Sequence, residues 1–252
     1  MARYLSFSVI GGVQWPIKKD EFSFGENVLV VLPCSRQYDA SIHIDLDANK
    51  ISQDDALSLL CEFASLVAWE DDQFLALHNG GCGAAKPCPF PRSSKLGMSS
   101  IFEKWPCIWS PIATEKHKVA LALYREGLNS GRSDCPQFSL LSFYKILEHL
   151  HPNSSSRVNF MENIVADLSR NNSVFKDELK RSGLYSLAAE EISKYLYENG
   201  RGFVAHSSKP PFLNPDSCAD MNIVGQTLWL MQMLARLAIA RYFELDEEFI
   251  WH

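Results

Sequence analysis

The sequence predicts an α+β protein with a β-rich N-terminal domain, one amphipathic helix in that domain, and an all-α helical bundle at the C-terminus. Three observations lead to this prediction. Short alternating or continuous runs of apolar residues typical of strands occur in the first fifty residues. Apolar residues recur at helical spacing after residue 111, and Gly and Pro crowd the stretch before it, from about residue 78. We therefore expect a β-rich domain at 1–95, a Pro-rich connection at 96–111 and a helical domain at 112–252.

Three strands and one helix are expected in the first region. Residues 4–10 and 42–46 alternate apolar and polar side chains, whereas 28–32 are continuously apolar and stop at Pro33. The spacing of the apolar residues then changes. Ser52 and Asp55 resemble a capping box, and apolar residues behind them recur at helical spacing, which predicts an amphipathic helix at 53–69.

Gly, Cys and Pro dominate residues 78–111, so we expect a long irregular connection there, with turns at its glycine pair. Four of its side chains are potential zinc ligands: His78, Cys82, Cys88 and Cys107. Their spacing matches no common structural-zinc pattern and lacks a CxxC pair, so no metal is predicted and a plain loop is favoured. No cofactor is predicted, because the chain lacks Walker-type and GxGxxG motifs.

Helical periodicity continues through the rest of the chain. The segments with an apolar stripe are 117–129, 137–150, 160–168, 174–179, 187–197 and 220–243. The last is the longest, and its apolar face is wider than one stripe. This width predicts burial on two sides, within the bundle and against a partner chain. Its uncharged stretch, 223–235, is too short to span a bilayer.

Composition and charge exclude several classes of protein. An apolar content of 46% excludes wholesale disorder, and a net charge of −6 argues against a general nucleic-acid coat. Seven cysteines scattered through 252 residues do not form a disulfide framework. The N-terminal residues are typical of a strand and not of a signal peptide, so we expect a cytoplasmic protein without a membrane partner.

One short string of residues suits catalysis. In ENGRGFVAHSS, Arg201 precedes His206 by five residues, which on a helix places them about 140° apart, within reach of one groove. Arginine offers a rigid fork of donors for a phosphate, and histidine transfers protons near neutral pH. Together they suit metal-free cleavage of RNA. Taken alone, however, the motif favours a surface arginine and a histidine that hydrogen-bonds a loop carbonyl.

The context of this motif resembles the HEPN superfamily. LLSFYKILEHL at 140–150, the Arg201 string, and MNIVGQTLWLMQMLARLAIARYF at 221–243 are similar to the HEPN-type domains of the ApeA and MauJ (methylamine-utilisation J) groups. SVIGGVQWP, VVLPCS and FASLVAW resemble the β-rich front half of MauJ-like proteins. The resemblance covers most of the chain and is more specific in the helical half.

The resemblance implies a metal-independent endoribonuclease that acts in stress response, toxin–antitoxin pairs or antiphage defence. HEPN domains commonly form homodimers through the helical domain, in which two such motifs face each other. The resemblance implies that Arg201 contacts the phosphate of an RNA substrate and that His206 transfers protons. The N-terminal domain would be a sensor or the surface for a regulatory protein partner.

One residue departs from the family pattern. The position after the arginine is usually polar, and here it is Gly202. This departure keeps open an alternative function, a catalytically inactive HEPN-like module that binds RNA or assembles with a partner protein. Asn199 is a candidate for supplying the missing polar group. The name of the MauJ group also suggests amine metabolism, but no residue here supports amine or redox chemistry.

Two further features have two interpretations each. Glu148 interrupts the apolar stripe of its helix, and it either orients Arg201 or His206 or pairs with Lys145 three residues earlier. Tyr144 and Tyr195 suit base stacking, but packing in the core or at a dimer interface is favoured for both.

Overall fold

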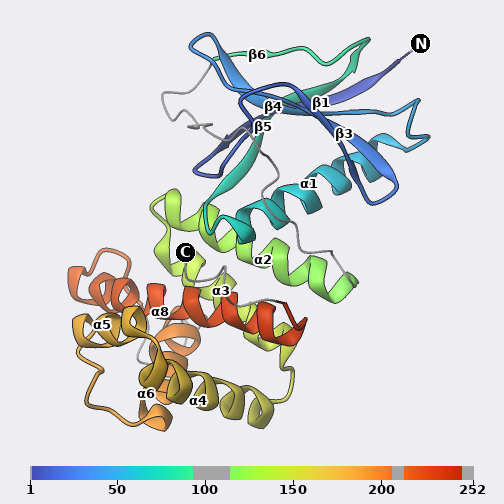
Figure 1. The fold of residues 1–252 in the computed structure, drawn as a ribbon. Helices are drawn as coiled ribbons and strands as arrows, with labels where there is room; N and C mark the ends of the chain where they lie inside the picture. The colour runs from blue at the N-terminus through green and yellow to red at the C-terminus, as the bar shows by residue number, and fades with distance from the viewer. Residues whose placement is uncertain (1, 93–113, 206–212, 246–252) are drawn as a thin grey trace. The chain divides into compact units, whose positions relative to one another are not determined.

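The computed structural model describes residues 2–92, 114–205 and 213–245 (Figure 1). The chain divides into two compact units, 1–112 and 113–252. The predicted α+β class is confirmed, with an antiparallel sheet in the first unit and helices in the second. The expected connection at 96–111 lies outside the described residues, so the domain boundaries stay a prediction.

The N-terminal unit is an antiparallel sheet with one long helix. Its strands are β1 (Tyr4–Gly11), β2 (Asp20–Phe24), β3 (Asn27–Leu32), β4 (Tyr38–Asp45), β5 (Leu75–Ala84) and β6 (Phe90–Pro91). The strand order is β2-β3-β4-β1-β5, and β6 pairs with β4. Helix α1 (Gln53–Glu70) lies along one face of the sheet (Figure 1). It begins as predicted, because the Ser52 hydroxyl accepts a hydrogen bond from the Asp55 N–H at 3.1 Å.

The prediction of an irregular connection from residue 78 is wrong for β5 and β6. β5 forms an antiparallel ladder with β1, in which Gly80 lies opposite Phe7. A Cβ atom on Gly80 would collide with Cδ1 of the Phe7 ring. The glycine is therefore a strand residue that makes room for an aromatic ring, and not a turn residue.

The C-terminal unit is helical. Its helices are α2 (Glu115–Arg132), α3 (Pro136–Leu150), α4 (Ser154–Asn171), α5 (Ser173–Arg181), α6 (Ala189–Leu196), the short α7 (Phe203–Ala205) and α8 (Cys218–Tyr242). Every residue from 233 to 240 in α8 is buried. The helix is long and apolar enough to cross a membrane, but 67% of its apolar window is buried inside the protein. Packing within the protein therefore accounts for its apolar faces, and the expected partner chain stays a prediction.

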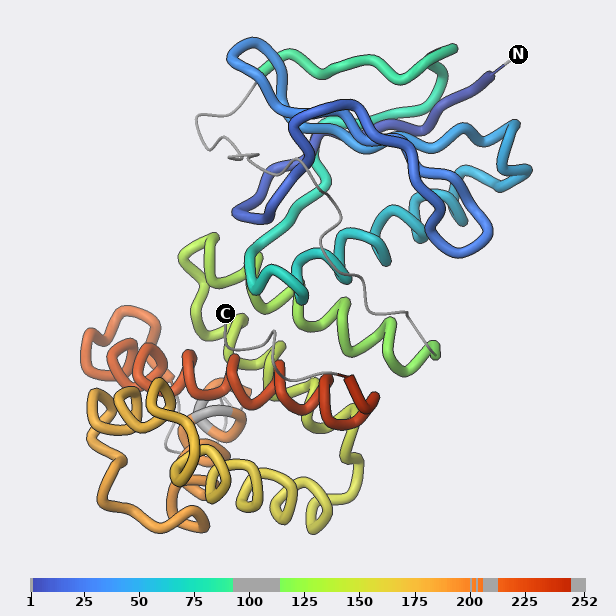
Figure 2. Tube along the Cα trace, viewed as in Figure 1, coloured from blue at the N-terminus to red at the C-terminus, as the bar shows by residue number. Residues whose placement is uncertain are grey.

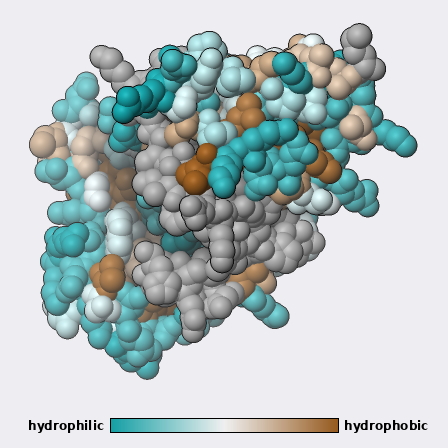
Figure 3. Space-filling view, turned by 45° about the horizontal axis from the view of Figure 1, so that its top comes forward, coloured by the Kyte–Doolittle hydropathy of each residue, from teal (hydrophilic) through white to brown (hydrophobic). Residues whose placement is uncertain are grey.

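The described residues on one face of the protein are mainly polar (Figure 3). The face in Figure 3 is mostly hydrophilic, and its hydrophobic residues form small separate groups. Exposed large apolar side chains in the helical unit include those of Val119, Phe138, Val158, Val174 and Tyr185. Single exposed apolar residues of this kind are normal and do not by themselves mark an interface.

Helices α2 and α3 pack closely at Gly127, which gives a first testable prediction. A Cβ atom there would lie 2.6 Å from Cε1 of Phe143. We expect Gly127→Ala to lower the free energy of unfolding by about 1–3 kcal/mol, because the ring has to move within a packed core. Urea unfolding of the full chain measures this change.

Gly225, inside α8, provides the matched control. A Cβ atom there would meet nothing within 4 Å. Gly225→Ala should therefore stabilise the protein by about 0.5–1 kcal/mol through its higher helix propensity. Equal effects of the two substitutions would contradict the close packing of α2 on α3.

Candidate functional site

Arg201 lies on an unusual helical turn. The chain continues from α6 into a π-helical turn, η1 (Tyr197–Gly202), and then into α7. The string ENGRG supplies one asparagine and two glycines, which are poor α-helix formers and permit the helix to widen. Because π-helical turns are rare and concentrate at functional sites, the position of Arg201 supports its candidacy.

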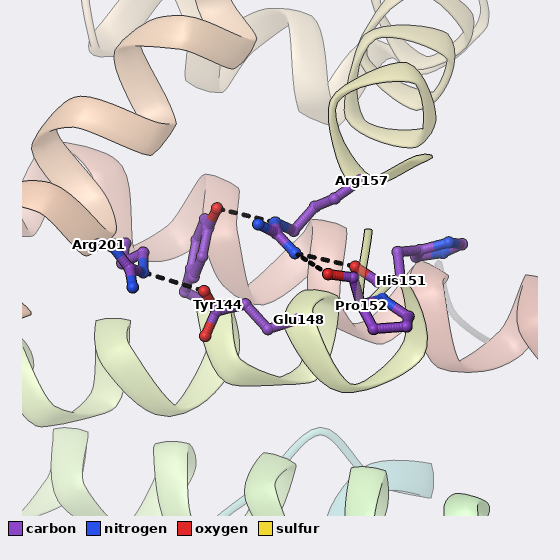
Figure 4. A network of polar contacts seen from close by, with 6 residues as sticks. All are labelled: Tyr144, Glu148, His151, Pro152, Arg157 and Arg201. Carbon is purple, nitrogen blue, oxygen red and sulfur yellow. Dashed lines mark hydrogen bonds and ion pairs between the residues drawn. The ribbon is translucent and has the colours of Figure 1, made fainter. Parts of the chain in front are cut away.

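Glu148, on α3, holds this arginine. Its Oε1 accepts a hydrogen bond from Nε–H of Arg201 at 2.9 Å, and the two side chains point toward each other in Figure 4. The side chains are 32% and 35% exposed, so the pair is within reach of solvent and of a ligand. Within the described part of the chain, Glu148 makes no ion pair with Lys145. The carboxylate therefore orients the guanidinium from a neighbouring helix.

The other two predicted site residues do not join this pair in the described structure. His206 lies outside the described residues, and its proton-transfer role stays a prediction. Asn199 is described, and its Nδ2–H donates to the carbonyl oxygen of Tyr195 at 3.1 Å. This bond supports the backbone where α6 passes into the π-helical turn. A role for Asn199 at the phosphate stays a prediction.

A second arginine, which the sequence analysis did not single out, lies near the pair. Arg157 donates through Nε–H to the Tyr144 hydroxyl at 3.2 Å, and through Nη1–H to the carbonyl oxygens of His151 at 2.9 Å and Pro152 at 3.5 Å. Figure 4 shows the Tyr144 ring between Arg157 and Arg201. The bonds from Arg157 fix the turn in which the chain leaves α3 and reverses into α4, traced in Figure 2.

One sequence signal points to Arg157. It occupies the first turn of α4, where the helix dipole disfavours a cation, so a specific partner is expected for it. The partner it finds, Tyr144, is only 1% exposed, which confirms the core interpretation of this tyrosine. Burial is the main cause that raises the Tyr144 pKa, so its hydroxyl keeps its proton at neutral pH. Burial likewise raises the pKa of Tyr195.

The candidate zinc ligands do not form a metal site among the described residues. His78 and Cys82 lie on β5, Cys88 follows that strand, and Cys107 is outside the described ranges. Both Cys82 and Cys88 are exposed and free. In the described ranges, no three His, Cys, Asp or Glu side chains gather closely enough to hold a metal ion.

The helical region also matches a known family. Residues 120–240 fit the model of the family described as Methylamine utilization protein MauJ. The helical region of this chain is MauJ-like. MauJ is a HEPN-like group, in agreement with the resemblance inferred from the sequence. The matched residues include Glu148 and Arg201, so the ion pair lies inside the MauJ-like region. No curated protein and no solved structure matches the chain.

Proposed function

We propose that this protein is a HEPN-type, metal-independent endoribonuclease whose site combines Arg201 and His206. The observation that carries the proposal is the ion pair between Arg201 and Glu148 on a π-helical turn of the MauJ-like region. A guanidinium oriented by a carboxylate presents a planar fork of donors, a geometry that suits recognition of a phosphate. His206 follows five residues later, where it supplies the group that transfers protons.

The proposed reaction uses the 2′-hydroxyl of RNA as the nucleophile. One His206 removes the proton from this hydroxyl, and the 2′-oxygen attacks the adjacent phosphorus. The bond from phosphorus to the 5′-oxygen breaks, and a protonated His206 from a second protomer gives this oxygen its proton. Arg201 stabilises the charge that develops on the phosphorane oxygens. The products are a 2′,3′-cyclic phosphate and a 5′-hydroxyl.

The family resemblance supports the setting of this reaction. The proposed enzyme is a cytoplasmic homodimer that pairs through its helical domain, so that both motifs contribute to one site. It acts in stress response or antiphage defence, and the N-terminal unit senses a signal or binds a regulatory protein. On dilution below the dimer dissociation constant, the cleavage rate per protomer should fall.

Cleavage of labelled cellular RNA and tRNA by the full-length protein in EDTA tests the function. We expect wild-type protein to cleave and His206→Ala to lose cleavage while keeping its fold, because no other group takes over the proton transfer. His78→Ala is the matched control, since His78 is an exposed histidine on β5. It should cleave like wild type. Full activity of His206→Ala would remove His206 from the site.

Gly202 favours a second candidate, an inactive HEPN-like module that binds RNA or assembles with a partner protein. The position after Arg201 lacks the polar side chain usual in the family, but space for one exists. A Cβ atom on Gly202 would lie 3.6 Å from the carbonyl oxygen of Tyr197, an ordinary van der Waals distance. The glycine is therefore not required by packing.

Gly202→Asn separates the two candidates. For an active ribonuclease, the added amide should keep the fold and raise the cleavage rate by about 3- to 10-fold, the effect of one added hydrogen bond to the substrate. RNA binding without cleavage, in wild type and variant alike, would favour the binding module. Cleavage assays and RNA-binding titrations on the same preparations distinguish these outcomes.

A further inference from the structure

A cavity of about 280 Å³ lies beside the ion pair in the helical unit, lined by residues of α3, α4, α6 and η1. Tyr144 and Tyr197 are both in its wall. Tyr144 precedes Glu148 by four residues on α3, and Tyr197 precedes Arg201 by four residues on η1. Residues four apart lie on one face of a helix, so the cavity and the ion pair are neighbours, about one helical turn apart.

Part of the cavity wall is aromatic and apolar. The rings of Tyr144 and Tyr197 have centroids 6.1 Å apart and are tilted by 55°. Tyr144 is buried, whereas Tyr197 is 43% exposed and therefore offers ring surface to a ligand. Val158 and Met161 of α4 complete the apolar lining. Such walls suit a flat, aromatic ligand.

A polar group without a partner lies in the same wall. Ser193 is 3% exposed, and its hydroxyl oxygen is buried with no hydrogen-bond partner among the described residues. Leaving such a group unpaired costs free energy, so most buried hydroxyls in native proteins are hydrogen-bonded. Ser193 lines the cavity, and a ligand with a hydrogen-bonding edge would satisfy its hydroxyl once the side chain rotates toward the cavity.

The charges around the cavity balance. Arg157 and Lys194 supply two positive charges, and Glu162 and Glu190 supply two negative ones. This balance favours a neutral ligand inside the cavity over a free anion. The cation that would take a phosphate, Arg201, lies about one helical turn away. A neutral aromatic ring joined to a phosphate is the combination that a nucleotide offers.

We propose that this cavity is a nucleobase subsite for the RNA strand whose phosphate lies at Arg201. The base stacks on Tyr197 and hydrogen-bonds the Ser193 hydroxyl, and the strand then passes the ion pair of Arg201 and Glu148. The subsite rests on the proposed ribonuclease function, and it adds a preference for particular bases next to the cleaved bond. Stacking alone is tolerant of sequence, so this preference comes from the polar edge.

Methyl NMR of the full-length protein tests the subsite. Its methionine methyl groups are ¹³C-labelled, the Met161 signal is assigned with Met161→Leu, and AMP, GMP, CMP and UMP are titrated separately. Because Met161 lines the cavity, a base bound there shifts its signal through the ring current. We expect at least one nucleotide to shift Met161. No shift with any of the four nucleotides would overturn the subsite.

Variants of the wall test the contacts. Tyr197→Ala should weaken nucleotide binding by about 5- to 100-fold through lost stacking, whereas Tyr197→Phe should retain it. Ser193→Ala should weaken binding by about 3- to 10-fold through one lost hydrogen bond. Tyr185→Ala is the matched control, because Tyr185 is an exposed tyrosine outside the cavity. Unchanged binding in Tyr197→Ala would overturn the stacking contact.

A 2′-fluoro trinucleotide, which has no 2′-hydroxyl and is not cleaved, distinguishes an RNA strand from a free nucleotide. We expect it to bind more tightly than the mononucleotide of the same base, and Arg201→Ala to remove that advantage. Tighter binding of the mononucleotide would assign the cavity to free nucleotides and overturn the RNA subsite.

The failure of the subsite and the failure of the ribonuclease give different results. If nucleotides shift the Met161 methyl signal but the protein cleaves no RNA, the ribonuclease function is refuted and a base-binding cavity remains. RNA cleavage that Tyr197→Ala leaves unchanged, in rate and in base preference, would refute the subsite and leave the ribonuclease.

Discussion

Arg201→Ala is expected to lower the rate of RNA cleavage by about 10²- to 10³-fold, because it removes the main donor to the charge that develops on the phosphorane. The fold should survive. The ion pair with Glu148 is partly exposed, and such pairs contribute about 0–1 kcal/mol to stability. Cleavage kinetics on labelled RNA and thermal unfolding of the same samples measure both effects.

Three further variants control this result. Arg201→Lys keeps the charge but loses the planar fork, so an intermediate rate is expected. Glu148→Gln keeps a hydrogen-bond acceptor for Arg201 and should cleave faster than Glu148→Ala. Arg170→Ala removes an exposed arginine of α4 and should leave cleavage unchanged. Unchanged cleavage in Arg201→Ala would contradict the assignment.

Acid should destabilise the protein through two buried histidines. His43, on β4, is fully buried, and its Nδ1 and Nε2 lie 2.8 Å from Oγ of Ser6 and 2.9 Å from Oγ of Ser41. Burial, with a smaller contribution from the charge of Lys19, lowers the His43 pKa to about 4. His117, on α2, is buried against Phe243 with ring centroids 4.1 Å apart, and burial lowers its pKa to about 4.

The direction of the change in stability with pH follows from the lowered pKa values of the two histidines. Between about pH 6.5 and pH 4 the unfolded chain binds protons that the folded chain excludes, so stability falls as the pH falls through this window. From pH 7 to pH 5 we expect each histidine to reduce the free energy of unfolding of its unit by about 2 kcal/mol. Stability should return as the pH rises again.

Urea unfolding at pH 7 and pH 5 measures this loss. Tryptophan fluorescence follows the unfolding, and Trp15 and Trp69, both buried in the N-terminal unit, contribute to this signal together with tryptophans such as Trp229 of α8. His43→Gln is the control, because an amide can both donate to one serine and accept from the other without titrating in this range. It should flatten the pH dependence. The same loss in wild type and His43→Gln would show that another group is responsible.

Elements with their own periodicity could be predicted from the sequence, and elements that depend on distant partners could not. The apolar stripes of α3 and α8 predict both helices to within a few residues of their bounds. β5 has no alternating apolar pattern. Gly80 accommodates the Phe7 ring, and only the pairing with β1 makes this segment a strand. β2 was missed because it is short and carries no buried residue.

The candidate site divides in the same way. Glu148 breaks an apolar stripe, which indicates a polar partner, but only the structure selects Arg201 over Lys145 as that partner. The glycines of ENGRG indicate a distorted helix without specifying a π-helical turn. The cavity beside Tyr197 and the unpaired hydroxyl of Ser193 arise from the packing of α3, α4, α6 and η1, which no local pattern encodes.

The chemistry of the RNA ends made by the purified protein in EDTA tests the central claim most directly. Mass spectrometry of the products should find 2′,3′-cyclic phosphate and 5′-hydroxyl ends, and a single 2′-deoxynucleotide before the cleaved bond should block cleavage there. Products with 3′-hydroxyl and 5′-phosphate ends, or cleavage next to the 2′-deoxynucleotide, would contradict a metal-free mechanism that uses the 2′-hydroxyl with Arg201 and His206.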